Sequence, residues 1–441
     1  MKTDLLIRGG RVIDPASGMD AVLDVRLRAG VVVEIGSGLA DGPERVFDAS
    51  GAIVTPGFVD LHAHLREPGF EHKGTIASET AAALRGGFTT VCAMPNTEPA
   101  PDSATVVEAL WERIRRDARV RVFPIGCVTR GRHGKELAEL SELAVSGCVA
   151  LSDDGSPVAD GRIMRRALEL AGALGLPLSE HSDDPQLNGG GSMNEGVISE
   201  RLGLAGQPAA AEIVAIARNL ALCETTGGRL HIAHVSTARG VELIAEAKGR
   251  GLRVTCEVTP SHLFLTEEAV FGSGPAPLYD TNAKINPPLR TEADRRALIQ
   301  GLKTGVIDAI ATDHAPHSIQ DKLCEFDAAA PGISCFETAL GSLLMQVEGG
   351  ELNLVDVIEA LTIAPARAFS LEKRNAGIGS LTLSVSTDLV VFDRDTLWTV
   401  EAARFVSKGR NTPLQGRKLL GRIRAVVADG VLDDREGVAR G

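Results

Sequence analysis

Short apolar runs recur along the middle of the chain, and most of them end in polar residues. Eight such runs lie at 59–64, 89–95, 119–126, 147–154, 176–182, 229–236, 253–260 and 308–316. Several are almost continuously apolar, which is typical of strands buried on both faces of a parallel sheet. Segments with helical periodicity separate them, with apolar stripes at 106–114 and 163–174. Eight alternations of strand and helix within about 250 residues predict an α/β fold, a (β/α)8 barrel.

The two ends of the chain have a different pattern. Residues 3–55 and 378–435 contain short strand-like pieces separated by glycine-rich turns, without long helical periods. We therefore expect the terminal segments to pair into one small β-sandwich. The predicted organisation is a first sandwich part at 1–55, a barrel at 56–367 and a second sandwich part at 368–441. The stretch 318–331 has little clear structure and follows the last barrel strand, where a mobile lid would lie.

Composition and charge limit the classes of function. The 441 residues carry a net charge of −12, which argues against a nucleic-acid partner. No apolar run reaches the roughly 18 residues that span a membrane, and the N-terminus does not resemble a signal peptide. The seven cysteines are scattered without a CxxC motif, which indicates reduced, buried thiols. A cytoplasmic protein is the expectation.

Two histidines one residue apart end the first barrel run. Alternate residues of a strand share a face, so His62 and His64 project side by side and can form half of a metal site. Arg66 lies two residues further on and supplies a positive charge for a substrate. A hydrogen-bonded histidine pair without a metal is the alternative for this motif alone.

The other strand ends add polar groups to the same rim of the barrel, where functional groups of such folds lie. They are Asn96, Asp153, Asp154, His181, His234 and Asp313, followed by His314 and His317. Imidazoles and carboxylates without thiolates suit Zn2+ or a similar divalent ion, and a bridging carboxylate would allow two ions. Either Asp153 or Asp154 is a candidate for that bridge. Asp313 is the candidate for orienting or deprotonating water, so the predicted chemistry is metal-assisted hydrolysis.

Other histidines have structural interpretations. His231 is three positions before His234 and points to the opposite face of its strand. His262 and His314 are expected to have packing or supporting roles. His72 and His133 lie in expected helices or loops and are interpreted as solvated.

These motifs together resemble the cyclic amidases of the amidohydrolase superfamily, and among them the class I bacterial dihydroorotases. The matching stretches are PGFVDLHAHLREPG (56–69), RGGFTTVCAMPNT (85–97), SDDG (152–155), HIAHVST (231–237), NPPLR (286–290), ATDHAPH (311–317) and PGISCFET (331–338). The resemblance implies reversible interconversion of L-dihydroorotate and N-carbamoyl-L-aspartate, a step of pyrimidine synthesis. It extends over most of the chain.

The resemblance also implies roles for individual residues. His62 and His64 correspond to ligands of a first metal, His181 and His234 to ligands of a second, and Asp154 to the shared carboxylate. Asp313 corresponds to the remaining ligand of the first metal and the catalytic acid/base. The implied substrate-binding residues are Arg66, Asn96, Asn286, His317, Pro331 and Gly332. The implied cofactor is Zn2+, one or two ions per subunit, and the expected assembly is a homo-oligomer, a dimer.

Three alternatives remain at this point. Another cyclic amidase, a hydantoinase or allantoinase, shares the metal motif, but an apolar hydantoin would leave Arg66 unpaired at a cost of several kcal/mol. A non-catalytic relative that supports aspartate carbamoyltransferase would have lost metal ligands, and this chain retains them. A catalytic complex with that transferase is compatible with the sequence. The run 147–154 has no lysine for the carbamylated bridge of many relatives, so an aspartate bridge is expected.

Overall fold

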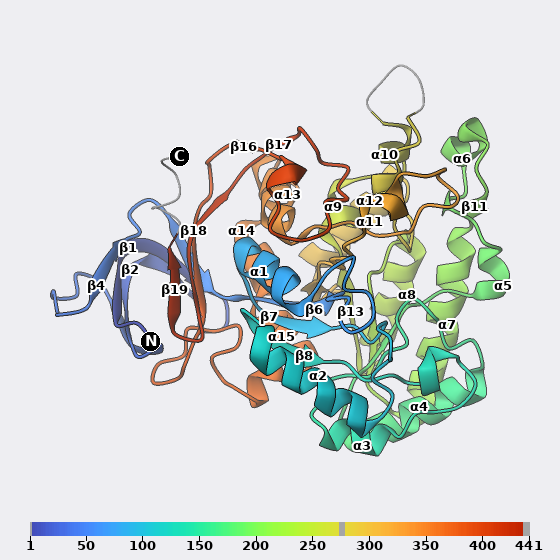
Figure 1. Ribbon diagram of the computed structural model, residues 1–441, viewed down its shortest axis with the longest axis horizontal. Coiled ribbons are helices and arrows are strands. Elements are labelled where there is room, and N and C mark those ends of the chain that lie inside the picture. Colours follow the sequence, from blue (N-terminus) through green and yellow to red (C-terminus); the bar gives the residue numbers. More distant parts are fainter. Residues whose placement is uncertain (1, 273–277, 435–441) are drawn as a thin grey trace.

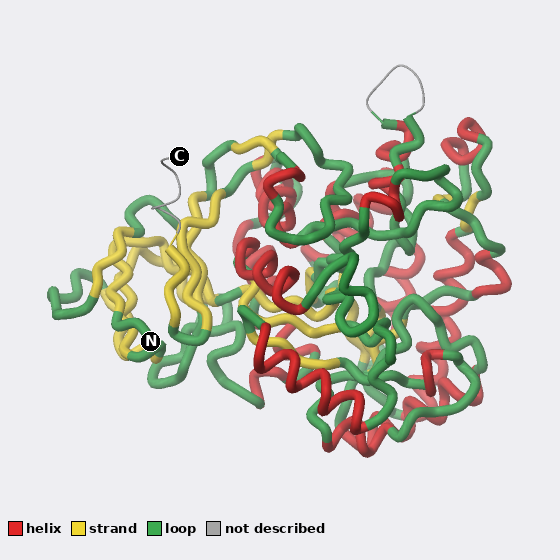
Figure 2. The backbone as a smooth tube through the Cα atoms, viewed as in Figure 1, coloured by secondary structure: helices red, strands yellow, loops and turns green. Residues whose placement is uncertain are grey.

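The predicted barrel is present in the computed structural model, which describes residues 2–272 and 278–434. Seven of the eight apolar runs contain a strand, and these strands form two parallel sheets (Figures 1 and 2). The first sheet has the order β6 (Phe58–Ala63), β7 (Phe88–Ala93), β8 (Arg121–Pro124). The second has the order β14 (Ala309–Ile310), β13 (Val254–Val258), β12 (Leu230–Ile232), β9 (Leu178–Glu180).

The eighth run, 147–154, differs from the prediction because it is too irregular to count as a strand. Its backbone nevertheless joins the two sheets, since Val149 N–H donates to Pro124 and Leu151 N–H donates to Pro177. Leu151 forms isolated bridges with Gly126 on one side and Leu178 on the other. On the opposite side, a parallel bridge between Ala63 and His314 closes the barrel.

Helices cover the outside of the barrel. The longer ones are α1 (Ile76–Gly86), α2 (Ala104–Asp117), α3 (Leu140–Val145), α4 (Gly161–Leu174), α7 (Ala209–Thr226), α8 (Ala238–Gly249), α11 (Glu292–Lys303), α13 (Phe336–Glu348), α14 (Leu354–Leu361) and α15 (Ile363–Ala368). Short elements near the strand ends are α5 (Pro185–Asn188), β10 (Met193–Asn194), α6 (Val197–Leu202), β11 (Gly206–Gln207), α9 (Pro260–Phe264), α10 (Glu268–Phe271) and α12 (Ile319–Lys322).

The boundaries of α1 show how local sequence fixes these helices. Thr75 accepts a hydrogen bond from Ser78 N–H, and the Ser78 hydroxyl accepts one from Thr75 N–H, which forms a capping box. The helix ends at Gly87, whose φ of 89° lies in the left-handed region that favours glycine. The predicted stripes of α2 and α4 bury Val107, Leu110, Ile114, Met164, Ala167, Leu168 and Ala171.

The chain ends pair as predicted, in one eight-stranded sheet beside the barrel. Its order is β19 (Val431–Asp434), β18 (Arg422–Ala428), β15 (Leu389–Asp393), β5 (Ile53–Pro56), β1 (Leu5–Asp14), β2 (Met19–Arg28), β3 (Val31–Gly36), with β4 (Arg45–Asp48) on β1. Antiparallel pairing of β5 with β15 joins the two termini. The predicted fold class, a (β/α)8 barrel with a terminal β-sandwich domain, is confirmed.

The terminal sheet and the barrel share packing and charge contacts. The Phe58 ring lies 5.6 Å from that of Phe88 in the barrel and 6.4 Å from that of Phe392 in the sheet. Arg121 of β8 donates to Asp388 at 2.9 Å. These contacts anchor the barrel at the end opposite to its functional rim.

Part of the C-terminal segment leaves the terminal sheet and packs on the barrel. The hairpin of β16 (Trp398–Thr399) and β17 (Lys418–Leu419) lies beside α13 (Figure 1). The divisions at 55/56 and 367/368 stay predictions, and residues 1, 273–277 and 435–441 of the predicted domains lie outside the described residues. No helix in the described ranges is long and apolar enough to cross a membrane.

Candidate metal centre and substrate pocket

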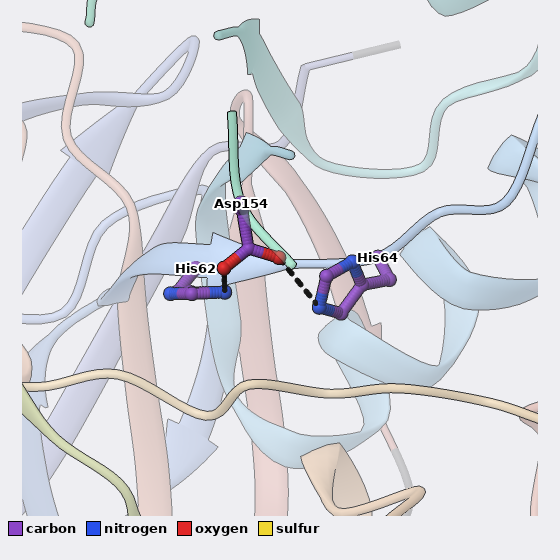
Figure 3. Close-up of side chains that lie close together, drawn as sticks. All are labelled: His62, His64 and Asp154. Atoms are coloured by element: carbon purple, nitrogen blue, oxygen red, sulfur yellow. Dashed lines mark ion pairs between the residues drawn. The ribbon is translucent and has the colours of Figure 1, made fainter. Parts of the chain in front are cut away.

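The barrel brings four predicted imidazoles around one carboxylate. His62 Nε2 lies 3.3 Å from Asp154 Oδ1, and His64 Nε2 lies 3.7 Å from Asp154 Oδ2 (Figure 3). His181 Nδ1 and His234 Nε2 approach the same Asp154 Oδ1 to 3.7 Å and 3.5 Å. Two overlapping groups result, each with its ligand atoms within 4.8 Å of one another, and Asp154 belongs to both.

The choice between the two adjacent aspartates follows from where their side chains point. Asp153 accepts hydrogen bonds from the backbone N–H groups of Val128 and Thr129 and from the Thr129 hydroxyl. It therefore holds the loop after β8. Asp154 is the aspartate that faces the imidazoles.

Two buried polar atoms at the centre have no hydrogen-bond partner among the described residues. They are His62 Nε2 and Asp154 Oδ1, which face each other across 3.3 Å. Leaving such atoms unsatisfied is costly, and a bound cation would satisfy both. Imidazole nitrogen and carboxylate oxygen, without sulfur, form a donor set that suits Zn2+ and similar divalent ions. The residues fit a metal.

The electrostatics describe the pair before a metal binds, and His62 has to lose its proton to become a ligand. Burial disfavours charge on both groups, but their mutual attraction outweighs it. The pKa of His62 is raised well above its usual value, and the pKa of Asp154 is lowered well below its own. The pocket thus stabilises an anionic carboxylate, which is the form that binds a metal.

Asp313 lies at the end of β14 and faces the first histidine pair. Its Oδ1 is 2.9 Å from His64 Nε2 and 3.6 Å from His62 Nε2. Burial raises its pKa, but the hydrogen bond from His64 and the nearby His62 outweigh burial, so the pKa is lowered overall. The φ of Asp313 is +46°, an uncommon conformation for a residue other than glycine. Such backbone strain is typical of functional positions.

Two supporting acids were not predicted. Glu257 of β13 lies 2.7 Å from His62 Nδ1 and 3.1 Å from His231 Nε2, so it fixes the orientation of His62. Asp60 accepts from the backbone N–H groups of His62 and Thr312, and burial raises its pKa to about 7. In the sequence, each of these residues could have been noticed only as a single acid inside an otherwise apolar run.

A cavity of about 400 Å3 lies beside the rim and is lined in part by Arg66, Lys73, Asn96 and Arg132. Arg66 Nε donates to Pro316 O at 3.1 Å, and burial lowers its pKa to about 10, so it stays charged at neutral pH. Asn96 Oδ1 accepts from His64 Nδ1 at 2.8 Å. The cavity lining thus includes cationic and amide groups together with the acids Glu98 and Asp102, and Asn96 connects it to His64.

The predicted residues after β13 and β14 do not line this cavity but lie near Arg66 and His181. His317 Nε2 lies 3.2 Å from Arg66 Nη2 and 2.9 Å from Pro331 O. Asn286 Nδ2 lies 3.3 Å from His181 Nε2. The Gly332 N–H donates to Lys284 O at 2.8 Å. A substrate ring that binds the backbone of Pro331 or Gly332 would have to replace the hydrogen bonds that these groups make to His317 and Lys284.

The remaining predicted features have these positions. His314 is buried, lies 2.8 Å from Glu79 Oε2 and stacks on Phe336. His262 is also buried and lies 3.1 Å from Pro287 O. The predicted loop 318–331 contains the short helix α12.

The (β/α)8 barrel with a β-sandwich domain and a histidine–aspartate cluster at its rim is a fold that solved hydantoinase structures share. L-hydantoinase from Arthrobacter aurescens has this fold, with a TM-score of 0.86, 24% identity, and coverage of 98% of this chain and 96% of that one. D-hydantoinase from Thermus sp. has a TM-score of 0.83 at 25% identity, with coverage of 98% and 96%.

Sequence comparison narrows this class. The "Dihydro-orotase-like" family model matches residues 51–240. A dihydroorotase from Anaeromyxobacter sp. (strain K) is 52% identical over 440 residues, which is 100% of both chains. A dihydroorotase from Citrifermentans bemidjiense is 48% identical over 97% of this chain and 98% of that protein. The chain belongs to the dihydroorotase family.

Glu257 provides a test of the metal centre. Glu257→Gln should lower metal affinity about 10- to 100-fold, because the amide orients His62 less strongly and does not raise its basicity. Competition with a chromophoric chelator measures this affinity. Glu44→Gln, at a buried acid paired with Arg26 in the terminal sheet, is the matched control. Equal affinities in all three proteins would contradict the supporting role.

Proposed function

We propose that the chain interconverts L-dihydroorotate and N-carbamoyl-L-aspartate for pyrimidine synthesis. The observation that carries the proposal is the 52% identity to a dihydroorotase over 440 residues. The groupings His62–His64–Asp154 and Asp154–His181–His234 support the hydrolytic chemistry. Ring opening adds water across one amide C–N bond, and cyclisation is the reverse.

In this proposal the four histidines hold the metal, with Asp154 as the shared ligand and Asp313 as a further ligand of the first position. Zn2+, one or two ions per subunit, is the metal we propose from the nitrogen and oxygen donor set. When bound, such an ion activates water near neutral pH and polarises the amide carbonyl. Glu257 supports this arrangement through His62 Nδ1.

Asp313 is the proposed acid/base. During ring opening its carboxylate accepts a proton from the attacking water and then donates a proton to the departing ring nitrogen. Burial raises its pKa, but the nearby histidines outweigh burial and lower it overall, so the carboxylate is ionised and can act as a base at neutral pH. The reverse reaction uses the same group in the opposite order.

Arg66, Asn96 and His317 are the proposed residues for the substrate carboxylate. A guanidinium binds a carboxylate with two parallel hydrogen bonds, which gives both affinity and orientation. Asn286 and the backbone of Pro331 and Gly332 are proposed to contact the ring.

The alternatives have less support. Hydantoinases share the fold, but fold alone does not define the substrate. A hydantoin with an apolar substituent would leave the buried Arg66 without a carboxylate. A non-catalytic relative is disfavoured because each predicted metal-binding residue is present and oriented toward the centre.

The setting of the enzyme is also part of the proposal. We propose the cytoplasm as its location, supported by seven free cysteines, six of which are buried. A homodimer and an association with aspartate carbamoyltransferase are proposed from the family resemblance alone.

One assay tests the function directly. The purified chain should hydrolyse L-dihydroorotate and cyclise N-carbamoyl-L-aspartate, and the same sample should contain one or two equivalents of zinc per subunit by elemental analysis. Removing the metal with a chelator should abolish both reactions, and added Zn2+ should restore them. A metal-loaded sample that is active on a hydantoin but not on dihydroorotate would refute the assignment.

The acid/base role has a shape-conserving test. Asp313→Asn should lower kcat about 10²- to 10⁴-fold because the amide cannot accept the proton. Metal content is measured on the same sample, so that loss of metal and loss of the base are separated. Asp20→Asn, in the terminal sheet, should retain normal turnover. Near-normal turnover in Asp313→Asn would rule out the role.

Substrate choice depends on the geometry of Arg66. Arg66→Lys keeps the charge but loses the planar guanidinium, so kcat/KM for dihydroorotate should fall by about 10-fold or more with unchanged metal content. Activity on the uncharged ring dihydrouracil should be weak in the parent protein and little altered. Arg121→Lys, at the start of β8 and at the opposite end of the barrel from Arg66, is the control. A parallel loss on both substrates would indicate general disruption rather than carboxylate recognition.

A further inference from the structure

A segment from the C-terminal part of the chain lies beside the substrate pocket. Residues 405–412, here called the crossing segment, follow β16 and precede β17. The Ser407 hydroxyl donates to Glu79 Oε2 at 2.6 Å, and the Lys408 N–H donates to Glu79 Oε1 at 3.1 Å. The segment is thereby fixed to α1, close to the end of β14.

Gly409 allows the crossing segment to approach the barrel closely. A Cβ atom at this position would lie 2.5 Å from Pro316 Cβ and 2.5 Å from Ser334 Oγ. Both neighbours belong to the segments that carry proposed substrate residues. The packing is therefore tight, and a side chain at position 409 would push the crossing segment away from Pro316 and Ser334.

The Asn411 side chain makes four hydrogen bonds at this contact, and its backbone carbonyl accepts a fifth from Ser334 N–H at 2.8 Å. Its Oδ1 accepts from the His317 N–H at 2.9 Å and from the Ser334 hydroxyl at 2.8 Å. Its Nδ2 donates to Ala315 O at 3.0 Å and to Gly332 O at 2.9 Å. Both donors and two acceptor positions of the amide are thus used, and the side chain is only 4% exposed.

The four partners lie on both sides of the loop 318–331. Ala315 and His317 precede it, while Gly332 and Ser334 follow it. A parallel bridge between His314 and Ile333 runs alongside. The Asn411 amide consequently sets the separation of the two loop ends, and with it the relative positions of the His317 ring and the Gly332 backbone.

We infer that Asn411 is a positioning residue for substrate binding, which acts by holding His317 and Gly332 at a fixed separation across the loop 318–331. This inference rests on the proposed function, because that proposal assigns His317 and Gly332 to the substrate. Asn411 does not touch the metal-binding residues by any described hydrogen bond. Substitution of Asn411 should therefore change substrate affinity and leave metal content unchanged.

Among side chains of this size, the amide is the one that both accepts the hydrogen bonds of His317 and Ser334 and donates those to Ala315 and Gly332. An aspartate has the same shape, but its second oxygen would face the carbonyls of Ala315 and Gly332 and repel both. Alanine removes all four bonds and leaves the buried groups unsatisfied. The two substitutions disturb the same contact in chemically different ways.

Steady-state kinetics on L-dihydroorotate test the inference. Asn411→Asp and Asn411→Ala should each raise KM about 10-fold or more, with a smaller change in kcat and unchanged zinc content, because small displacements of binding groups are costly. KM within about twofold of the parent value in both variants would overturn it. Ser334→Ala removes a single bond to Oδ1 and should give a smaller rise in KM, which provides a measurement if the stronger variants do not fold.

A double-mutant comparison separates positioning from general destabilisation. In a His317→Ala background, Asn411→Ala should raise KM less than it does in the parent, since residues that act through one another are not additive. Full additivity would overturn the inference.

Asp14→Ala is the matched control. Asp14 is a buried side chain of the terminal sheet that accepts from Ala16, Ser17, Ser380 and Leu381. Its loss should lower thermal stability and leave KM unchanged. An equal rise in KM for Asp14→Ala would contradict positioning. If the parent protein instead prefers another cyclic amide, the proposed function fails, and the same KM comparison on that substrate still decides the role of Asn411.

Discussion

The burial of the Asp154 carboxylate is the constraint on which the site depends. An isolated charge in such surroundings is strongly unfavourable, so it has to be compensated by cations or donors nearby. Compensation comes from imidazoles on three different strands, His62, His64, His181 and His234. These side chains meet only if the barrel closes with the correct register. Glu257 and Asp60 extend the polar network to β13 and the end of β14, which ties that closure to the geometry of the centre.

The sequence predicted the fold through periodicity and predicted the site through strand ends. The apolar runs located seven strands, and the one-residue spacing of His62 and His64 placed both rings at one centre. The run 147–154 could not be recognised as irregular, because its bonds to both neighbours depend on the closed barrel. Glu257 was missed because it is a single acid within its strand and forms no spaced motif with another polar residue nearby in the sequence. Asn411 was missed because its partners lie about 80 to 100 positions away in the chain and include three backbone groups.

Backbone strain was a further feature outside the reach of pattern analysis. Arg66, His234 and Asp313 have φ values of 66°, 33° and 46°. Residues other than glycine adopt such values at an energetic cost, which the surrounding structure has to offset. All three lie at the rim, where the chain turns sharply after a strand. The strain re-aims the side chains toward the shared pocket. Glycine would relieve this strain, but it would remove the side chain that each position supplies to the rim.

Hydantoinases and this chain share one fold, and because a fold does not define a substrate, substrate preference has to come from side chains placed on the barrel. The positioning role inferred for Asn411 would give the C-terminal part of the chain a share in substrate binding. Its strands β15 and β18 complete the terminal sheet, and Phe392 and Asp388 contact the lower end of the barrel. The crossing segment then returns to the upper rim and reaches His317 and Gly332 through Asn411. The terminal domain is therefore not an independent appendage, because the same stretch of chain contacts one end of the barrel and reaches the backbone of His317 and Gly332 at the other.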